Sequence, residues 1–192
     1  MPMKRIALFT ALAAAVFGGC KAPQESAPSA LDVIMTRTSV RNFTGEPVSQ
    51  EQLETLLKAG MAAPTAMNSQ PWRFVVVTDK EKIAQVFGSG FRGEMFKAAG
   101  AVIVVCGEME NMFWFEDCSA AAENILLAAH ALGLGAVWTA GYPAMERIAP
   151  IAAALGIPEK VLPLCIIPVG VPAETPAPKD KWKAENIHWN QW

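Results

Sequence analysis

The 192-residue sequence is poor in the features that indicate a metal site, a nucleic-acid surface or a membrane-spanning helix. Its four cysteines form no CxxC pair, and its two histidines, His130 and His188, lie at no metal-ligand spacing, so no metal is expected. The formal net charge of −2 and the lack of a long basic stripe exclude a typical nucleic-acid binder. Beyond the N-terminal segment, no stretch of about 20 apolar residues occurs that would span a bilayer.

Apolar residues, in contrast, are abundant. Hydrophobic residues make up 52% and charged residues 18% of the chain, which excludes a protein that is disordered as a whole. This composition predicts a domain that buries a sizeable core, and the length fits one such domain.

Residues 1–19 have the layout of a secretory signal peptide. Lys4 and Arg5 precede an apolar run at 6–17, which is followed by two glycines and Cys20. Small residues before a cysteine are typical of a bacterial lipoprotein cleavage site, so we predict cleavage before Cys20 and its acylation. The alternative is an ordinary signal peptide with an incidental cysteine.

The segment 20–30 is predicted to be a tether, because it is rich in Ala, Pro and Ser and shows no apolar periodicity. The folded domain is then expected at 31–192. The predicted localisation is exported, as a membrane-anchored lipoprotein or a periplasmic protein, with the membrane contacted only through the lipid anchor.

Hydrophobic periodicity predicts helices and strands that do not alternate strictly, which favours an α+β fold. Helices are expected at 31–35, 50–60, 80–87 and 117–133, and strands at 74–78, 101–106, 136–139 and 162–169. One or two helical turns should follow Pro143, break at Pro150 and end at Gly156. Pro163 and Pro168 predict that the last strand lies at a sheet edge or is restricted to its middle.

Polar side chains on a short extended segment indicate an anion site. In Arg37-x-Ser39-x-Arg41, two guanidinium groups and a hydroxyl point the same way, because side chains on an extended chain repeat with a period of two. Arginine binds phosphate oxygens bidentately, and Lys179 and Lys181 supply two more cations near the C-terminus. The alternative interpretation of the arginines is a solvated charged loop.

A second polar segment precedes the strand predicted at 74–78. Thr65, Asn68 and Gln70 place a hydroxyl and two amides in a rigid turn, and amides suit a ring with alternating N–H and C=O groups. The glycines at 133–141 would let the backbone approach a flat ligand closely.

Several other features receive structural interpretations. The segment 88–93 matches GxGxxG but follows a predicted helix rather than a strand, so a flexible glycine-rich loop is favoured over a dinucleotide site. His130 is expected to be packed and hydrogen-bonded rather than catalytic. The tail at 172–192 holds three of the six tryptophans without periodicity, so it needs a surface on its own domain or on a partner subunit. His188 is assigned to that docking tail.

Together these segments resemble the FMN-dependent nitroreductase family. The resemblance extends from residue 31 to the C-terminus and rests on four segments in the family's order and spacing, at 37–43, 63–72, 133–135 and 178–192. It implies a mixed, mainly antiparallel sheet flanked by helices in an intertwined homodimer. It also implies two FMN molecules, each bound in a cleft between the subunits.

The resemblance assigns cofactor-binding roles to residues of this chain. The phosphate and ribityl end of FMN would be held by Arg37, Thr38, Ser39, Arg41, Lys179 and Lys181. The flavin ring would be contacted by Pro64, Thr65, Asn68 and Gln70, with Thr65 coming from the second subunit. Its reactive edge would lie near Trp138, Thr139, Ala140 and Gly141. Two residues depart from the family: Lys181 stands where Arg is usual, and Ala140 stands where some members have Glu.

The implied activity is that of an FMN-dependent NAD(P)H oxidoreductase. It would reduce nitroaromatic or quinone-type acceptors by ping-pong two-electron transfer, and no protein group is named as a catalytic acid or base. One alternative is an exported flavin-binding module that transfers electrons or senses a partner without NAD(P)H turnover. Another is a flavin-dependent dehalogenation or fragmentation enzyme.

Overall fold

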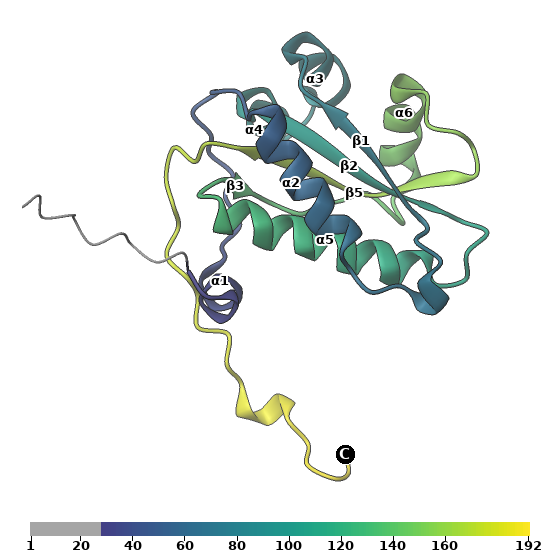
Figure 1. Ribbon diagram of the computed structural model, residues 1–192. Helices are drawn as coiled ribbons and strands as arrows, with labels where there is room; N and C mark the ends of the chain where they lie inside the picture. Colours follow the sequence, from purple (N-terminus) through teal and green to yellow (C-terminus); the bar gives the residue numbers. More distant parts are fainter. Residues whose placement is uncertain (1–27) are drawn as a thin grey trace, which may run out of the picture.

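The computed structural model describes residues 28–192 (Figure 1). The signal peptide predicted at 1–19 and the acylation predicted at Cys20 lie outside the described residues. So does the tether predicted at 20–30, except for its last three residues, which begin the described part.

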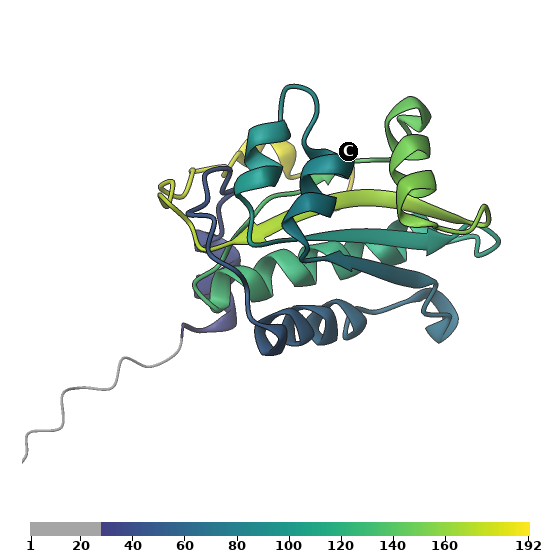
Figure 2. The ribbon, with the colours of Figure 1, turned by 90° about the horizontal axis from the view of Figure 1, so that it is seen from above.

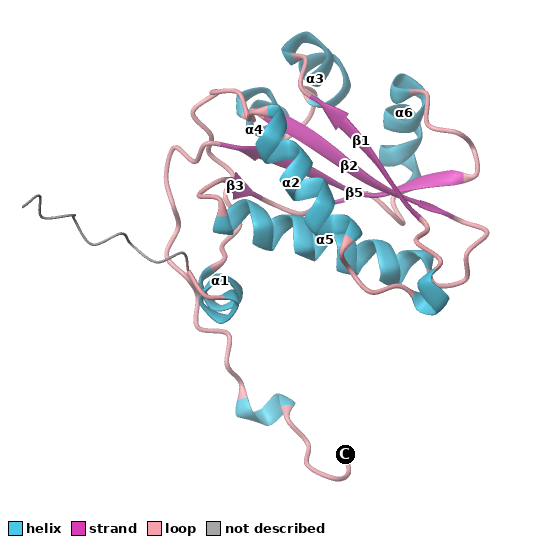
Figure 3. Ribbon diagram, viewed as in Figure 1, coloured by secondary structure: helices cyan, strands magenta, loops and turns pink. Residues whose placement is uncertain are grey.

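One antiparallel sheet forms the centre of the domain (Figure 3). Its five strands are β1 (Trp72–Val77), β2 (Ala101–Glu108), β3 (Gly135–Ala136), β4 (Thr139–Ala140) and β5 (Val161–Gly170). Their order is β1-β2-β5-β3, and β4 pairs with the same strand β5; each of these pairs is antiparallel. The sheet and its helices agree with the predicted α+β class.

Helices cover both faces of the sheet (Figures 1 and 2). One face packs against α2 (Gln50–Met61) and α5 (Trp114–Ala131), and the other against α3 (Lys80–Phe87), α4 (Gly93–Ala98) and α6 (Met145–Leu155). The short helix α1 (Ala30–Thr36) lies beside α5, and the 3₁₀ turns η1 (Ala66–Asn68) and η2 (Ala184–Asn186) lie in loops. A three-layer α-β-α arrangement results.

The apolar run of β2 explains why both faces are covered. Ala101, Ile103 and Val105 join the core under α2 and α5, whereas Val102 and Val104 join the core under α3 and α4. Neighbouring strand residues point to opposite faces, so a strand without polar residues must be buried on both. The predicted buried strand at 101–106 is therefore confirmed.

The two longest helices begin differently. Ser49 caps α2 and exchanges hydrogen bonds with Gln52 in a capping box, as its sequence predicts. Helix α5 begins at Trp114, so the start predicted at Asp117 is wrong. The Asp117 carboxylate does not cap the helix, because it accepts hydrogen bonds from another loop.

The proline-based predictions for β5 are also wrong. Strand β5 is central, and its two prolines occupy places where pairing is already interrupted. Pro163 lies next to a β-bulge in β5, where Leu164 has no partner in β2, and Pro168 falls between the short pairings with β3 and β4. The strand predicted at 136–139 is accordingly two separate two-residue strands.

Helix α6 runs through Pro150 instead of breaking there. Ile148 is fully buried, and Ile151 and Leu155 pack against the core beneath α6, so tertiary packing holds the helix together across the proline. Gly156 ends the helix in the left-handed conformation with φ of 66°, as predicted.

The C-terminal part of the tail, which includes η2, extends away from the domain (Figure 1). Trp182, Trp189 and Trp192 are all exposed, and the ring of His188 stacks on Trp192 with the centroids 4.1 Å apart. The tail therefore does not bury its tryptophans on its own domain, which leaves the partner-subunit alternative.

The three cysteines in the described residues are buried, as predicted. Burial raises the pKa of Cys106 and Cys118 to about 12, and that of Cys165 well above its usual value near 9. Because the thiolate is the reactive form, these thiols are expected to be inert in the folded protein.

We predict that a Cys20→Ser variant does not react with Ellman's reagent at mildly alkaline pH until the chain is unfolded in guanidinium. From about pH 9 towards pH 12 the folded chain keeps thiol protons that the unfolded chain releases, so the free energy of unfolding should fall as pH rises. Equal reaction rates of the native and unfolded chains would contradict the prediction.

Candidate functional site

Basic residues from two distant parts of the chain line one cavity of about 240 Å³. The extended segment after α1 and the tail contribute the lining residues Arg37, Thr38, Ser39, Arg41, Pro176, Ala177, Lys179 and Lys181. We call this cavity the cationic pocket. It brings together all six residues assigned to the phosphate end of a cofactor.

The electrostatics of the cationic pocket favour an anion. It is lined by four cationic side chains and by no carboxylate. In the described residues only Arg37 of these four forms an ion pair, with its Nε 3.4 Å from Glu123 Oε1. Within residues 28–192, the buried Thr38 hydroxyl has no hydrogen-bond partner. Buried polar groups are nearly always hydrogen-bonded, so this hydroxyl is available to a ligand. A phosphate group would satisfy both the hydroxyl and the cations, so the residues fit FMN.

Backbone and side-chain contacts fix the segment that carries the arginines. The Val40 N–H donates to Ala136 O at 3.1 Å. The Val40 side chain packs against Gly135, where an added Cβ would lie only 2.6 Å from Val40 Cγ1. Just before the segment, Thr36 Oγ1 lies 2.9 Å from His130 Nε2. His130 therefore has the packed, hydrogen-bonded role that was predicted.

The second candidate segment, Thr65–Gln70, is a strained loop, which we call the amide loop. Met67, Asn68 and Gln70 have positive φ values of 52°, 55° and 49°. Non-glycine residues rarely adopt this conformation, and it persists where the surroundings enforce it. The Gln70 amide donates to Asn68 Oδ1 at 3.0 Å, and Pro64 directly precedes the loop.

Asp117 is one group that enforces the loop conformation. Its buried carboxylate accepts a hydrogen bond from Ala66 N at 3.1 Å and another from Ser69 Oγ at 3.4 Å. Only one feature of the sequence indicates this role: an acidic residue in line with the apolar stripe of α5 at Ala121 and Ile125.

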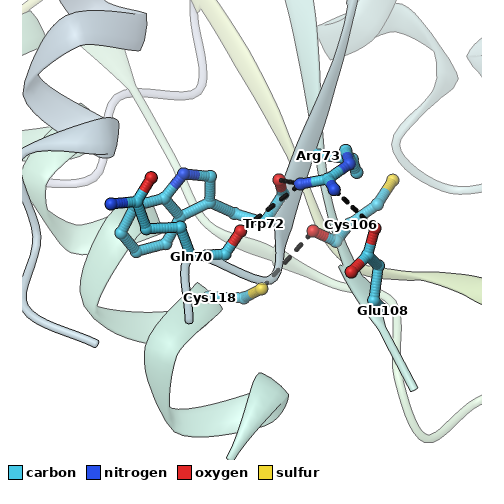
Figure 4. A network of polar contacts seen from close by, with 6 residues as sticks. All are labelled: Gln70, Trp72, Arg73, Cys106, Glu108 and Cys118. Atoms are coloured by element: carbon cyan, nitrogen blue, oxygen red, sulfur yellow. Dashed lines mark hydrogen bonds and ion pairs between the residues drawn. The ribbon is translucent and has the colours of Figure 1, made fainter. Parts of the chain in front are cut away.

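Arg73 attaches the other end of the amide loop to the sheet (Figure 4). Its Nη1 donates to Gln70 O at 3.3 Å and to Trp72 O at 2.7 Å, and its Nη2 donates to Glu108 Oε1 at 2.5 Å. An arginine in a strand belongs to no recognisable motif, so this role could not be predicted from the sequence.

The third candidate segment, Trp138–Gly141, borders β5. The buried Thr139 hydroxyl donates to Ile166 O at 2.6 Å, and Gly141 N donates to Leu164 O at 3.0 Å. A Cβ on Gly141 would lie 2.9 Å from Leu164 O, so a glycine is required there. Ala140 is exposed, and Trp138 is half-buried against the core.

One chain does not bring the cationic pocket and the amide loop together. The amide loop is held at Asp117 in the first turn of α5, whereas the segment before Arg37 is held at His130 in the last turn. The helix rises about 20 Å between those two residues. The two sets of residues are therefore held near opposite ends of α5.

Within residues 28–192, no helix has the length and apolar character needed to cross a membrane. The same part of the chain contains no group of three or more His, Cys, Asp or Glu side chains placed to hold a metal ion.

Comparison with known proteins gives consistent matches. The model of the nitroreductase family matches residues 34–91 and 88–171. A protein of Methanothermobacter thermautotrophicus, described as a candidate NADH dehydrogenase/NAD(P)H nitroreductase, is 41% identical over 84% of this chain and 87% of its own length.

Two solved structures share the fold. A candidate NADH dehydrogenase/NAD(P)H nitroreductase of Bacteroides thetaiotaomicron is 43% identical, with a TM-score of 0.82 over 87% of this chain and 100% of that one. An FMN-dependent nitroreductase of Clostridium difficile is 31% identical, with a TM-score of 0.77 over 84% of this chain and 99% of that one.

These matches contradict the predicted localisation. The matching proteins from archaea and from Bacillus subtilis are described by their use of NADH or NAD(P)H, and pyridine nucleotides are reductants of the cell interior. The prediction of an exported protein, membrane-anchored or periplasmic, is therefore wrong. It had relied on residues 1–30 alone, almost all of which lie outside the described residues.

We predict that Asp117→Ala lowers the free energy of unfolding by about 1–3 kcal/mol, because it leaves the Ala66 N–H without its acceptor. Glu116, the exposed residue beside Asp117, provides a matched control: Glu116→Ala should change the free energy of unfolding by less than about 0.5 kcal/mol. Urea unfolding measures both values. Hydrogen exchange of the amide loop should accelerate only in the Asp117 variant, and equal effects of the two substitutions would refute the anchoring role.

Proposed function

Since the chain belongs to the nitroreductase family, we propose that it is an FMN-dependent oxidoreductase that moves two electrons from NAD(P)H to a small electrophilic acceptor. The observation that carries the proposal is the cationic pocket, with its excess of cations and its unpartnered Thr38 hydroxyl. When bound, FMN supplies hydride acceptance and donation, which no side chain of the protein provides.

The cationic pocket holds the phosphate end of the cofactor. Arg41, Lys179 and Lys181 form no ion pair in the described residues, so they can bind phosphate oxygens without giving up a carboxylate partner. Arg37 is oriented by Glu123, and Ser39 offers a neutral donor. Lys181 provides charge without the bidentate geometry of arginine.

A homodimer completes the site. The amide loop of one subunit would supply the amides of Asn68 and Gln70 to the flavin ring held by the cationic pocket of its partner. Two features support this arrangement: the separation of the two sets along α5, and the exposed tryptophans of the tail. Helix α1 adds Leu31, Ile34 and Met35 as exposed apolar residues that a partner could cover.

The segment Trp138–Gly141 would border the reactive edge of the flavin. Its backbone is fixed by Thr139 and Gly141, so the exposed residue between them keeps a constant position. That residue is Ala140, which has no ionisable group. The chain therefore offers no carboxylate there, and the proton required in acceptor reduction would come from water or from the acceptor.

The acceptor is proposed to be a nitroaromatic compound or a quinone. Donor and acceptor would occupy the same site in turn, as ping-pong transfer requires. The cationic pocket and the amide loop hold the cofactor in place through both half-reactions.

Anaerobic mixing of the FMN-loaded protein with NADH or NADPH tests this function. We expect loss of the visible flavin absorbance on mixing, and its return when p-benzoquinone or nitrobenzene is added. A protein that binds FMN but is not reduced at millimolar donor would contradict the oxidoreductase and favour an electron-transfer module. A protein that rejects FMN would contradict the assignment of the cofactor itself.

Arg41→Gln should weaken FMN binding by about tenfold or more, because it removes a charge-assisted hydrogen-bond donor. Lys58→Gln, an equal loss of charge on α2 outside the site, is the matched control and should leave the affinity unchanged. Fluorescence titration with FMN measures both affinities.

Mixing two variants tests the two-chain site. Arg41→Gln and Gln70→Ala homodimers should each bind FMN weakly. In a mixed dimer, one of the two sites combines the intact cationic pocket of one chain with the intact amide loop of the other. Tight binding should therefore reappear after the variants are unfolded and refolded together. No recovery, in a sample shown to contain mixed dimers, would refute a site shared between subunits.

A further inference from the structure

A second cavity, of about 580 Å³, lies on the face of the sheet that α3, α4 and α6 cover. It shares no lining residue with the cationic pocket. Its volume falls within the range of small-molecule sites. Nothing in the proposed FMN chemistry uses it.

The interior of this second cavity is apolar and aromatic. Its walls are formed by Val86, Phe87, Phe96, Pro150, Ile151 and Ile166. The rings of Phe87 and Phe96 stack with their centroids 5.4 Å apart, and the ring of Phe91 is fully exposed at the mouth. Aromatic rings attract other aromatic rings in offset or edge-to-face contact, so a planar aromatic ligand suits this interior.

The rim of the second cavity carries an excess of positive charge. Arg92, Arg147 and Glu146 are its charged lining residues, which leaves one cation in excess. Across residues 28–192, neither arginine forms an ion pair, whereas Arg37 and Arg73 both do. Two guanidinium groups without protein partners beside an apolar cavity complement a ligand that carries a carboxylate.

The glycine-rich loop at 88–93 builds this rim. A Cβ on Gly93 would lie 2.1 Å from Gly88 O, and one on Gly88 would lie 2.2 Å from Ala84 O, so both positions need glycine. The tight loop that results carries Ser89 and Arg92 to the edge of the second cavity. The GxGxxG pattern thus shapes a cavity wall and not a dinucleotide turn after a strand.

From these observations we propose that the second cavity binds a small aromatic carboxylate. Its rings lie against the apolar wall that includes Phe87, Phe96 and Ile151, and its carboxylate is bound by Arg92 and Arg147. The site is separate from the cofactor site, so its occupation does not require FMN.

Isothermal titration calorimetry with 2-naphthoate tests the proposal on the purified full chain, with and without saturating FMN. We expect saturable binding in both conditions. The neutral isostere 2-naphthamide should bind at least about tenfold more weakly, because it cannot form charge-assisted hydrogen bonds with the guanidinium groups. Absence of binding at millimolar 2-naphthoate would overturn the proposal, as would equal affinity for the acid and the amide.

Substitutions locate the binding. Arg92→Gln and Arg147→Gln should each weaken 2-naphthoate binding by about tenfold, and Ile151→Trp should abolish it by filling the second cavity. Lys58→Gln on α2 is the matched control and should bind like the parent protein. FMN affinity, measured in the same samples, should remain unchanged. Binding that persists in all three cavity variants, or that disappears when FMN is added, would place 2-naphthoate in the cofactor site and refute the proposal.

Discussion

Burial of β2 and β5 on both faces is the constraint on which the rest of the structure depends. Strand β2 directs Ile103 towards α2 and α5, and Val104 towards α3 and α4, with no polar side chain in its first six residues. Each fully buried aliphatic side chain contributes roughly 1.5–3 kcal/mol of transfer free energy, so neither helical layer can be removed without a large loss. The loops that carry polar residues are consequently confined to the ends of these layers.

Helix α5 sets the distances between those loops. It anchors the amide loop through Asp117, orients Arg37 through Glu123, and holds the start of the arginine segment through His130. An α-helix has a fixed rise of 1.5 Å per residue, so these anchors cannot approach one another. The cationic pocket and the amide loop are therefore held near opposite ends of α5, and the proposed two-chain flavin site rests on this separation. The same helix therefore serves as a core element and as a spacer.

Much of the fold could be predicted because its signals are local. The capping box at Ser49, the apolar run of β2 and the left-handed glycine at Gly156 each depend on a few neighbouring residues. The failures arose where tertiary packing overrides a local rule. Pro150 stays within a helix whose apolar side is buried, and Pro168 lies in a central strand because no ladder partner faces it between β3 and β4. The helix start predicted at Asp117 is wrong because this residue serves the amide loop, and the hydrogen-bond partners of its carboxylate lie about 50 residues away in the sequence.

The sequence by itself determined the chemistry available to this protein: four cations, two amides and the glycines at 133–141, in an order typical of one family. It also determined the existence of most helices and strands, because hydrophobic periodicity is a property of neighbouring residues. Only the tertiary structure decided which of these groups meet. It brings the tail lysines to Arg37 and Arg41, and it keeps the amide loop at the far end of α5. It also forms a second cavity on the face of the sheet covered by α3, α4 and α6, lined by two arginines that form no ion pair within residues 28–192. Periodicity specifies which face of an element is buried, but the distances between loops depend on how the elements pack.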